Sequence, residues 1–245
     1  MDKYQQDTLA IRSGYERTHE NEHAEAMFLT SSYVFESAEM AAKYFSNELQ
    51  GNVYSRYTNP TVRSFEQRLA AMEEGEQCVA TASGMAAALS VIMALLQSGD
   101  HVVCSQDVFG STRVMMDKYI TKFGVSVTYV PLADLHAWQA AMQPNTKMLF
   151  CETPSNPLSE VADLEALAAI SKKAGATFVV DNCFCTPVLQ KPLNWGADIV
   201  VHSATKYIDG QGRCLGGAVV GNSDLMEQVV GFLRAAGPTM SPFNA

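Results

Sequence analysis

The sequence predicts an α/β protein whose core is a mostly parallel sheet of seven strands, with helices on both faces. Short runs of consecutive apolar residues recur between residues 78 and 221, and strands buried on both faces have this continuous apolar pattern. Stretches with helical periodicity separate most of these runs, and strands that alternate with helices form parallel sheets. The predicted strands are 78–81, 101–105, 125–130, 148–152, 177–181, 198–203 and 217–221, and the predicted helices are 85–96, 112–123, 136–142 and 164–173.

The first 60 residues differ from the rest of the chain. They mix charged and aromatic side chains without a sustained period, which is typical of an arm rather than of a unit that folds by itself. Residues 61–245 contain all the predicted strands and form the predicted large domain. With 47% hydrophobic and 18% charged residues, the chain has enough apolar material for the core of a soluble globular protein.

The composition excludes several classes of partner. A net charge of -9 leaves no basic surplus to meet the phosphates of a nucleic acid or an anionic membrane. The longest apolar run, residues 91–96, is far too short to cross a bilayer, and the first residues lack the apolar segment of a secretion signal. Cys183 and Cys185 form a C-x-C without a second pair at metal-ligand spacing. These observations predict a cytoplasmic protein without a metal site.

Polar residues gather after the predicted strands, and ligands of open α/β sheets bind beyond the carboxyl ends of the strands. The segment "HSATKY" follows the strand 198–203 and places Ser203, Thr205 and Lys206 before a glycine-rich loop. Lys206 is either an ordinary solvated lysine or a nucleophilic amine at the mouth of a pocket.

Three further positions at this edge have a structural and a functional interpretation. The turn at Gly84 starts a helix, so it is either a helix cap or a cradle for a phosphate. Asp181 ends a buried strand, where it either caps a turn or accepts a hydrogen bond from a cationic ring nitrogen. Phe109 either joins the core or offers an aromatic face. Together with an amine, these groups are what a pyridoxal phosphate site needs.

Six motifs, "YSRYTNPT", "SGM", "FGST", "ETPSNP", "VDN" and "HSATKY", occur in an order that resembles the Cys/Met-metabolism family of pyridoxal phosphate-dependent enzymes. The family includes cystathionine γ-synthases, γ- and β-lyases and acylhomoserine sulfhydrylases. The resemblance implies the fold-type I architecture, pyridoxal 5'-phosphate as cofactor, and a homo-oligomer with a dimer as the minimum active unit and a tetramer as the expected assembly. The family continues into a smaller C-terminal domain beyond the position of Ala245, so we expect that domain, and the arginine that binds the substrate carboxylate, to be absent from this sequence.

The resemblance also implies roles for the residues that match the motifs. Lys206 corresponds to the catalytic lysine that forms a Schiff base with the cofactor. Four groups are implied to hold the cofactor phosphate. They are the side chains of Ser203 and Thr205 and the backbone of Gly84 and Met85.

The remaining implied contacts concern the cofactor ring and the neighbouring subunit. Asp181 would keep the pyridine nitrogen protonated, Asn156 would contact the 3-oxygen, and Phe109 would stack on the ring face. In this family the "YSR" motif reaches into the site of the neighbouring subunit, so Tyr54 and Arg56 imply a shared active site.

Phe109 departs from the family pattern, because most members have a tyrosine on the ring face. A phenol can protonate a departing thiolate and phenylalanine cannot, whereas an O-acyl group leaves as a stable carboxylate, so Phe109 favours an acylhomoserine substrate. The segments "VFGST" and "YSRYTNPT" most resemble those of O-succinylhomoserine sulfhydrylases. This resemblance implies replacement of succinate by sulfide to give homocysteine in methionine biosynthesis. The alternatives are a cystathionine γ-synthase, a γ-lyase, or an inactive domain that binds pyridoxal phosphate. The donor (acetyl or succinyl) and the nucleophile (sulfide or cysteine) stay open.

Overall fold

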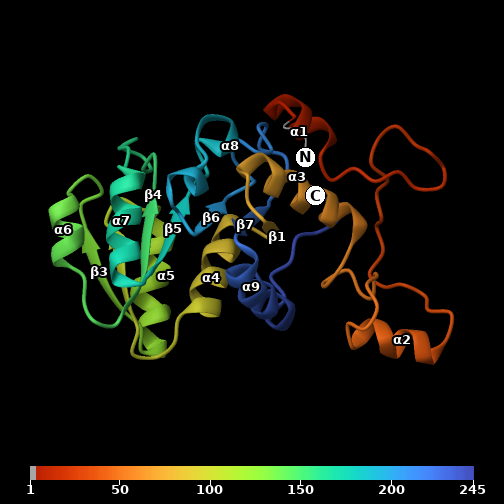
Figure 1. The fold of residues 1–245 in the computed structure, drawn as a ribbon, viewed down its shortest axis with the longest axis horizontal. Helices are drawn as coiled ribbons and strands as arrows, with labels where there is room; N and C mark the ends of the chain where they lie inside the picture. Colours follow the sequence, from red (N-terminus) through yellow and green to blue (C-terminus); the bar gives the residue numbers. More distant parts are fainter. Residues whose placement is uncertain (1–3) are drawn as a thin grey trace.

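A computed structural model describes residues 4–245 and contains the predicted α/β sheet (Figure 1). The strands are β1 (Gln77–Thr81), β2 (His101–Ser105), β3 (Ser126–Val130), β4 (Thr146–Glu152), β5 (Thr177–Asp181), β6 (Ile199–His202) and β7 (Gly217–Gly221). They lie in the order β1-β7-β6-β5-β4-β2-β3. Strand β7 is antiparallel to both of its neighbours, and the other pairs are parallel. The prediction of a mostly parallel seven-stranded sheet is confirmed.

The four predicted helices are present, with ends that differ by a few residues from the predicted ones. The structure also contains further helices that were not predicted. The helix expected over 112–123 ends at Lys118, and a separate 3-10 turn follows it over Ile120–Phe123. None of the described helices is both long and apolar enough to span a membrane. The helices are α1 (Gln6–Arg12), α2 (Ala38–Phe45), α3 (Pro60–Glu73), α4 (Gly84–Leu95), α5 (Gly110–Lys118), α6 (Leu135–Ala140), α7 (Leu164–Ala174), α8 (Thr186–Leu189) and α9 (Ser223–Ala236).

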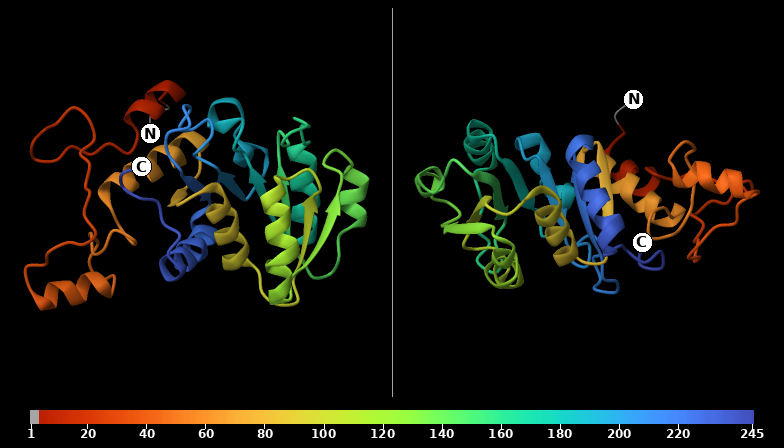
Figure 2. Two further views of the ribbon diagram at one scale, coloured as in Figure 1. Left: turned by 180° about the vertical axis from the view of Figure 1, so that it is seen from behind. Right: turned by 90° about the horizontal axis from the view of Figure 1, so that it is seen from below.

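The sheet is buried on both faces, which explains its continuous apolar strands. Successive side chains of a strand point to opposite faces, so Val179 packs in the core beneath α4, α5 and α9, while Val180 packs beneath α6 and α7. Figure 2, viewed from below, shows helices on the two sides of the sheet. This arrangement leaves the strand ends as the place where polar side chains can gather.

The edge strand β1 is covered rather than exposed. The carboxylate of Glu66, on α3, accepts a hydrogen bond from the Ala80 N–H at 2.8 Å. The Ala82 N–H donates to the Pro238 carbonyl, also at 2.8 Å, and Thr81 forms an antiparallel bridge with Thr239. These contacts satisfy backbone groups that an open edge would present to other chains.

The N-terminal segment runs outside the sheet. Helix α1 packs on α3, whereas α2 lies at the far end of an extended stretch, away from the sheet (Figure 1), and has no buried residue. Asn59 caps α3, which begins at Pro60. The division into an arm over 1–60 and a domain over 61–245, and the contact of the arm with a neighbouring subunit, stay predictions.

Candidate functional site

The start of α4 and the segment after β6 touch at the strand ends. A Cβ atom at Gly84 would lie 2.6 Å from the Ser203 Cβ, so only glycine allows this approach. A Cβ atom at Gly217 would likewise lie 2.2 Å from the Ser83 carbonyl oxygen. The structure thus brings together the "SGM" turn and the "HSATKY" segment, which are far apart in the sequence.

The first turn of α4 has free donors at this contact. The Ser83 hydroxyl caps the helix by accepting a hydrogen bond from the Ala86 N–H at 3.1 Å. Within residues 4–245, the N–H groups of Gly84 and Met85 have no hydrogen-bond partner, and neither has the Ser203 hydroxyl. Unpaired N–H groups at the positive end of a helix suit an anion such as a phosphate. The donor set therefore fits the phosphate of the expected cofactor.

Lys206 lies in the turn that follows β6, and its side chain is exposed. Its N–H donates to the Ser203 carbonyl at 3.1 Å. The Thr205 hydroxyl both donates to the Gly216 carbonyl and accepts from the Gly216 N–H, each at 3.1 Å. Thr205 therefore closes the loop after Lys206, and its predicted contact with a phosphate would have to replace the bond to the Gly216 carbonyl.

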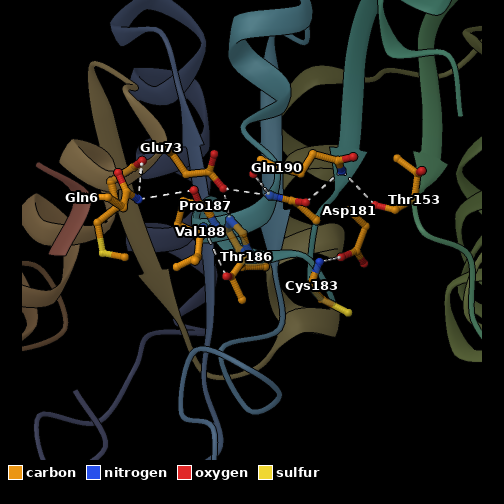
Figure 3. Close-up of polar contacts among 12 residues, drawn as sticks. Gln6, Glu73, Thr153, Asp181, Cys183, Thr186, Pro187, Val188 and Gln190 are labelled. Carbon is orange, nitrogen blue, oxygen red and sulfur yellow. Dashed lines mark hydrogen bonds and ion pairs between the residues drawn. The ribbon is translucent and has the colours of Figure 1, made fainter. Parts of the chain in front are cut away.

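Asp181 is the last residue of β5. Its carboxylate and the amine of Lys206 both influence the thiol of Cys183. The Asp181 carboxylate accepts a hydrogen bond from the Cys183 N–H at 3.2 Å (Figure 3). Burial raises the pKa of Asp181 to about 6, while the positive charge of His202 and the bond from Cys183 oppose this shift. Burial and the Asp181 charge raise the pKa of the Cys183 thiol, and the Lys206 ammonium lowers it. The predicted acid and the predicted amine thus both act on Cys183.

Glu152 is a member of the site to which the sequence analysis assigned no role. It ends β4, pairs in register with Asp181, and is 2% exposed. Its carboxylate accepts a hydrogen bond from the Phe109 N–H at 2.6 Å, which fixes Phe109 at the start of α5 with 43% of its surface exposed. Burial, and then the charge of Asp181, raise the pKa of Glu152 to about 8. The signal in the sequence was an acidic residue that directly follows the four apolar residues 148–151.

The raised pKa of Glu152 predicts a pH-dependent stability. In the unfolded chain the carboxyl loses its proton near its ordinary pKa of 4.5, whereas the folded protein keeps the proton to about pH 8. The folded state binds more protons at Glu152 between these values, so the contribution of Glu152 to the stability of the wild type falls as the pH rises through them. Glu152→Gln cannot ionise and keeps an oxygen for the Phe109 N–H. The melting temperature of the variant minus that of the wild type should therefore increase between about pH 5 and pH 8. Above about pH 8 this difference should stay constant.

Melting curves of the two proteins in the absence of cofactor test this expectation. Glu160→Gln, at an exposed position of the same loop, is the matched control and should show no such trend. A difference between Glu152→Gln and the wild type that stays constant with pH would show that Glu152 ionises normally in the folded protein.

Asn156 lies in the loop after β4, in a groove of about 840 Å³ that Phe184 and Tyr207 also line. The rings of Phe184 and Tyr207 meet edge to face, with centroids 6.0 Å apart. The groove thus brings Asn156 together with Tyr207, the residue that directly follows Lys206.

Tyr54 and Arg56 lie apart from the other predicted site residues of the same chain. Tyr54 forms a backbone bridge with Ser32. The Arg56 guanidinium donates to the Arg234 carbonyl at the end of α9 and stacks on Tyr57 with its carbon 4.5 Å from the ring centroid. Among the described residues, no hydrogen bond or ion pair joins Tyr54 or Arg56 to the strand-end cluster.

Comparison with solved structures identifies the class of protein. The chain matches a crystal structure of a putative O-acetylhomoserine (thiol)-lyase from Campylobacter jejuni with a TM-score of 0.93 and 30% identity, covering 99% of this chain and 68% of that one. That structure carries a pyridoxyl-lysine monophosphate. The fold is that of the fold-type I pyridoxal phosphate-dependent enzymes, and the predicted cofactor is confirmed.

Sequence comparisons identify the family. A profile described as Cys/Met metabolism PLP-dependent enzyme matches residues 7–245. An O-succinylhomoserine sulfhydrylase from Pseudomonas aeruginosa is 63% identical over 98% of this chain and 59% of its own length. Another from Mycobacterium tuberculosis is 45% identical over 100% of this chain and 60% of its own length. The chain belongs to the Cys/Met-metabolism family, and it spans about three fifths of the length of these relatives.

Proposed function

We propose that the protein replaces the acyloxy group of an O-acylhomoserine, with O-succinylhomoserine as the donor, by sulfide, so that homocysteine forms and succinate leaves. The reaction would serve methionine biosynthesis in the cytoplasm. The observation that carries the reaction class is the strand-end cluster of Gly84, Asp181, Ser203 and Lys206, whose groups suit an anionic phosphate, a cationic ring and a covalent attachment. The relatives at 63% and 45% identity support the substrate class.

The chain's own residues would divide the work. When bound, pyridoxal phosphate withdraws electrons from the α-carbon of an amino acid. Lys206 would hold the cofactor and, once released by the substrate amine, move the proton at the α-carbon. Asp181 would hold the proton on the ring nitrogen.

The contacts with phosphate and ring would orient the cofactor. The N–H groups of Gly84 and Met85, with the hydroxyls of Ser203 and Thr205, would bind the phosphate. Two groups would contact the ring, Asn156 at its 3-oxygen and Phe109 on its face.

Phe109 supports a carboxylate leaving group. The Phe109 N–H donates a hydrogen bond to the Glu152 carboxylate at 2.6 Å. This bond holds the backbone of Phe109 in place at the start of α5. A phenylalanine there supplies a stacking face but no acidic proton. Succinate needs none, because it departs as a stable anion, whereas a thiolate benefits from one.

We also propose that the active unit is at least a dimer, within a tetramer. Arg56 contacts the end of α9 in the single chain rather than the strand-end cluster. Guanidinium groups are suited to phosphate recognition. The proposal is that Tyr54 and Arg56 of one subunit complete the phosphate site of its neighbour.

Borohydride reduction followed by peptide mapping tests the proposed attachment. A pyridoxyl group should appear on Lys206. A label on Lys172, Lys173 or Lys191 instead would contradict the assignment.

A substrate assay tests the reaction itself. The purified protein, loaded with pyridoxal phosphate, is given O-succinylhomoserine or O-acetylhomoserine with sulfide or with cysteine. We expect homocysteine from O-succinylhomoserine and sulfide. Cystathionine as the main product would indicate a cystathionine γ-synthase, elimination without a nucleophile would indicate a lyase, and bound cofactor without turnover would indicate an inactive domain.

A further inference from the structure

A buried carboxylate and a buried imidazole meet behind the predicted cofactor site. The Glu73 Oε1 and the His202 Nε2 lie 2.5 Å apart, and both side chains are fully buried. Glu73 ends α3, whose other buried residues are apolar, and His202 ends β6. Burying two such groups is costly unless they pair as ions with good hydrogen bonds. The short distance and the full burial show that the carboxyl of Glu73 and the imidazole of His202 share a hydrogen bond inside the protein.

Glu73 reaches the residues next to two predicted cofactor ligands. Besides His202, which precedes Ser203, its Oε1 accepts a hydrogen bond from the Asn182 amide at 3.1 Å, and Asn182 directly follows Asp181. Asn182 and Gln190 in turn exchange two hydrogen bonds at 2.8 and 3.0 Å. Figure 3 shows this network extending from Glu73 through Gln190 to Thr153. One carboxylate therefore anchors the chain at the ends of both β5 and β6.

The Glu73–His202 pair lacks the complete hydrogen bonding expected of an interaction that stabilises the fold. The second oxygen of Glu73, Oε2, and the second ring nitrogen of His202, Nδ1, are buried without a partner among the described residues. Each unsatisfied buried group costs free energy, and apolar side chains in place of a buried ion pair are often equally stable or more so. The arrangement therefore costs stability, which points to a role other than holding the fold together.

A positive charge on His202 would act on Asp181. Burial raises the pKa of Asp181, and the charge of His202 is the largest influence that opposes this rise. His202 follows Val201, the register partner of Asp181 on the adjacent strand. In turn, burial and then the charge of Asp181 raise the pKa of the neighbouring Glu152 carboxyl, since like charges disfavour ionisation.

We infer that the Glu73–His202 pair is a positioning element for the cofactor ring: it maintains a positive charge behind Asp181 and so keeps that carboxylate ionised for the ring nitrogen. The inference rests on the proposed role of Asp181. Glu73 and His202 touch neither substrate nor cofactor in this scheme and act only through Asp181.

The test measures the protonation of the ring nitrogen rather than turnover. Protein loaded with pyridoxal phosphate labelled with ¹⁵N in the ring is compared by NMR for the wild type, Glu73→Gln and His202→Gln at one neutral pH. Both variants keep a hydrogen-bonding group of similar size but lose the charged pair. We expect the ratio of protonated to unprotonated ring nitrogen to fall about tenfold in each, the change that accompanies one unit of pKa.

A second buried histidine gives the control. His101 is 1% exposed and binds the hydroxyls of Thr146 and Thr128, each at 2.8 Å, at the opposite ends of the strands. His101→Gln should lose stability through the same loss of a buried imidazole but leave the ring nitrogen unchanged. An equal change in His101→Gln would mean that the effect reports general loosening of the sheet.

The outcomes separate this inference from the proposed function. An unprotonated ring nitrogen in the wild type would overturn the role of Asp181 itself. A protonated nitrogen in the wild type that is unchanged in Glu73→Gln and His202→Gln would overturn only the inference. If both variants fail to fold, ¹⁵N-histidine spectra of the wild type without cofactor decide, because the inference requires His202 to be protonated on both nitrogens and a neutral tautomer contradicts it.

Discussion

Asp181→Asn is expected to retain pyridoxal phosphate but to slow exchange of the substrate α-proton about 10- to 150-fold. The reason is that a neutral amide cannot hold the proton on the ring nitrogen. A charge-assisted hydrogen bond contributes about 1.5–3 kcal/mol, and each 1.36 kcal/mol corresponds to a factor of ten. The amide oxygen can still accept the bond from the Cys183 N–H, which the Asp181 carboxylate accepts at 3.2 Å, so the local backbone should keep its conformation.

Exchange of the α-proton in deuterated water, followed by NMR, measures the effect separately from the later steps. Asp198→Asn is the control, because Asp198 is also a partly buried acid with a raised pKa, and it binds the Phe178 N–H at 2.7 Å at the other ends of the strands. Exchange that is unchanged in Asp181→Asn would mean that the ring nitrogen has another partner. Glu152, the register neighbour of Asp181, would then be the first candidate.

Phe109→Tyr is expected to shift the substrate preference toward thiolate leaving groups. The ring face that stacks is unchanged, and the position is 43% exposed, so an added hydroxyl need not be buried. A well-placed general acid accelerates a reaction about 10²–10⁴-fold. We therefore expect γ-elimination from methionine or cystathionine to rise at least about tenfold relative to reaction of O-succinylhomoserine, even with imperfect placement of the phenol.

The measurement is the ratio of kcat/KM for the two kinds of substrate in the variant and the wild type. Phe123→Tyr, at another exposed phenylalanine in the 3-10 turn after α5, should leave the ratio unchanged. If the ratio does not move in Phe109→Tyr while the cofactor stays bound, the missing phenol does not select the leaving group. The substrate proposal would then rest on similarity to the relatives alone.

The sheet could be predicted from the sequence because its strands are buried on both faces, which leaves unbroken apolar runs. Two long helices, α3 and α9, were not among the predicted helices, for different reasons. The buried face of α3 carries Glu73 among its apolar residues, which weakens the helical pattern. Helix α9 has sequence signals at both ends, a capping Asn222 and a terminal Gly237 in the left-handed region, although the predicted helices did not include it.

The strand-end rule predicts part of the candidate site, but it does not predict the residues that pack behind it. Glu73 and His202 are 129 residues apart in the sequence, and the pairing depends on how α3 packs against β1 and β7, next to β6 in the sheet. Glu152 and Phe109 likewise meet only because β4 and β2 are neighbours in the sheet. Local pattern predicts which residue types lie at strand ends, whereas tertiary packing determines which of them share a proton or a hydrogen bond.

The antiparallel strand β7 has a consequence for the order in which the protein can assemble during synthesis. Strand β1 leaves the ribosome early, yet among the strands of residues 4–245 its only partner in the sheet is β7, with Gln77 opposite Gly221. Pairing between such distant segments is slow, because a long loop must close before the contact forms. Until β7 emerges, the nascent chain exposes an unpaired strand, the kind of surface that chaperones protect. The contact of Gly84 with Ser203 also waits for β6, so the proposed phosphate site cannot form until the segment after β6 has been synthesised.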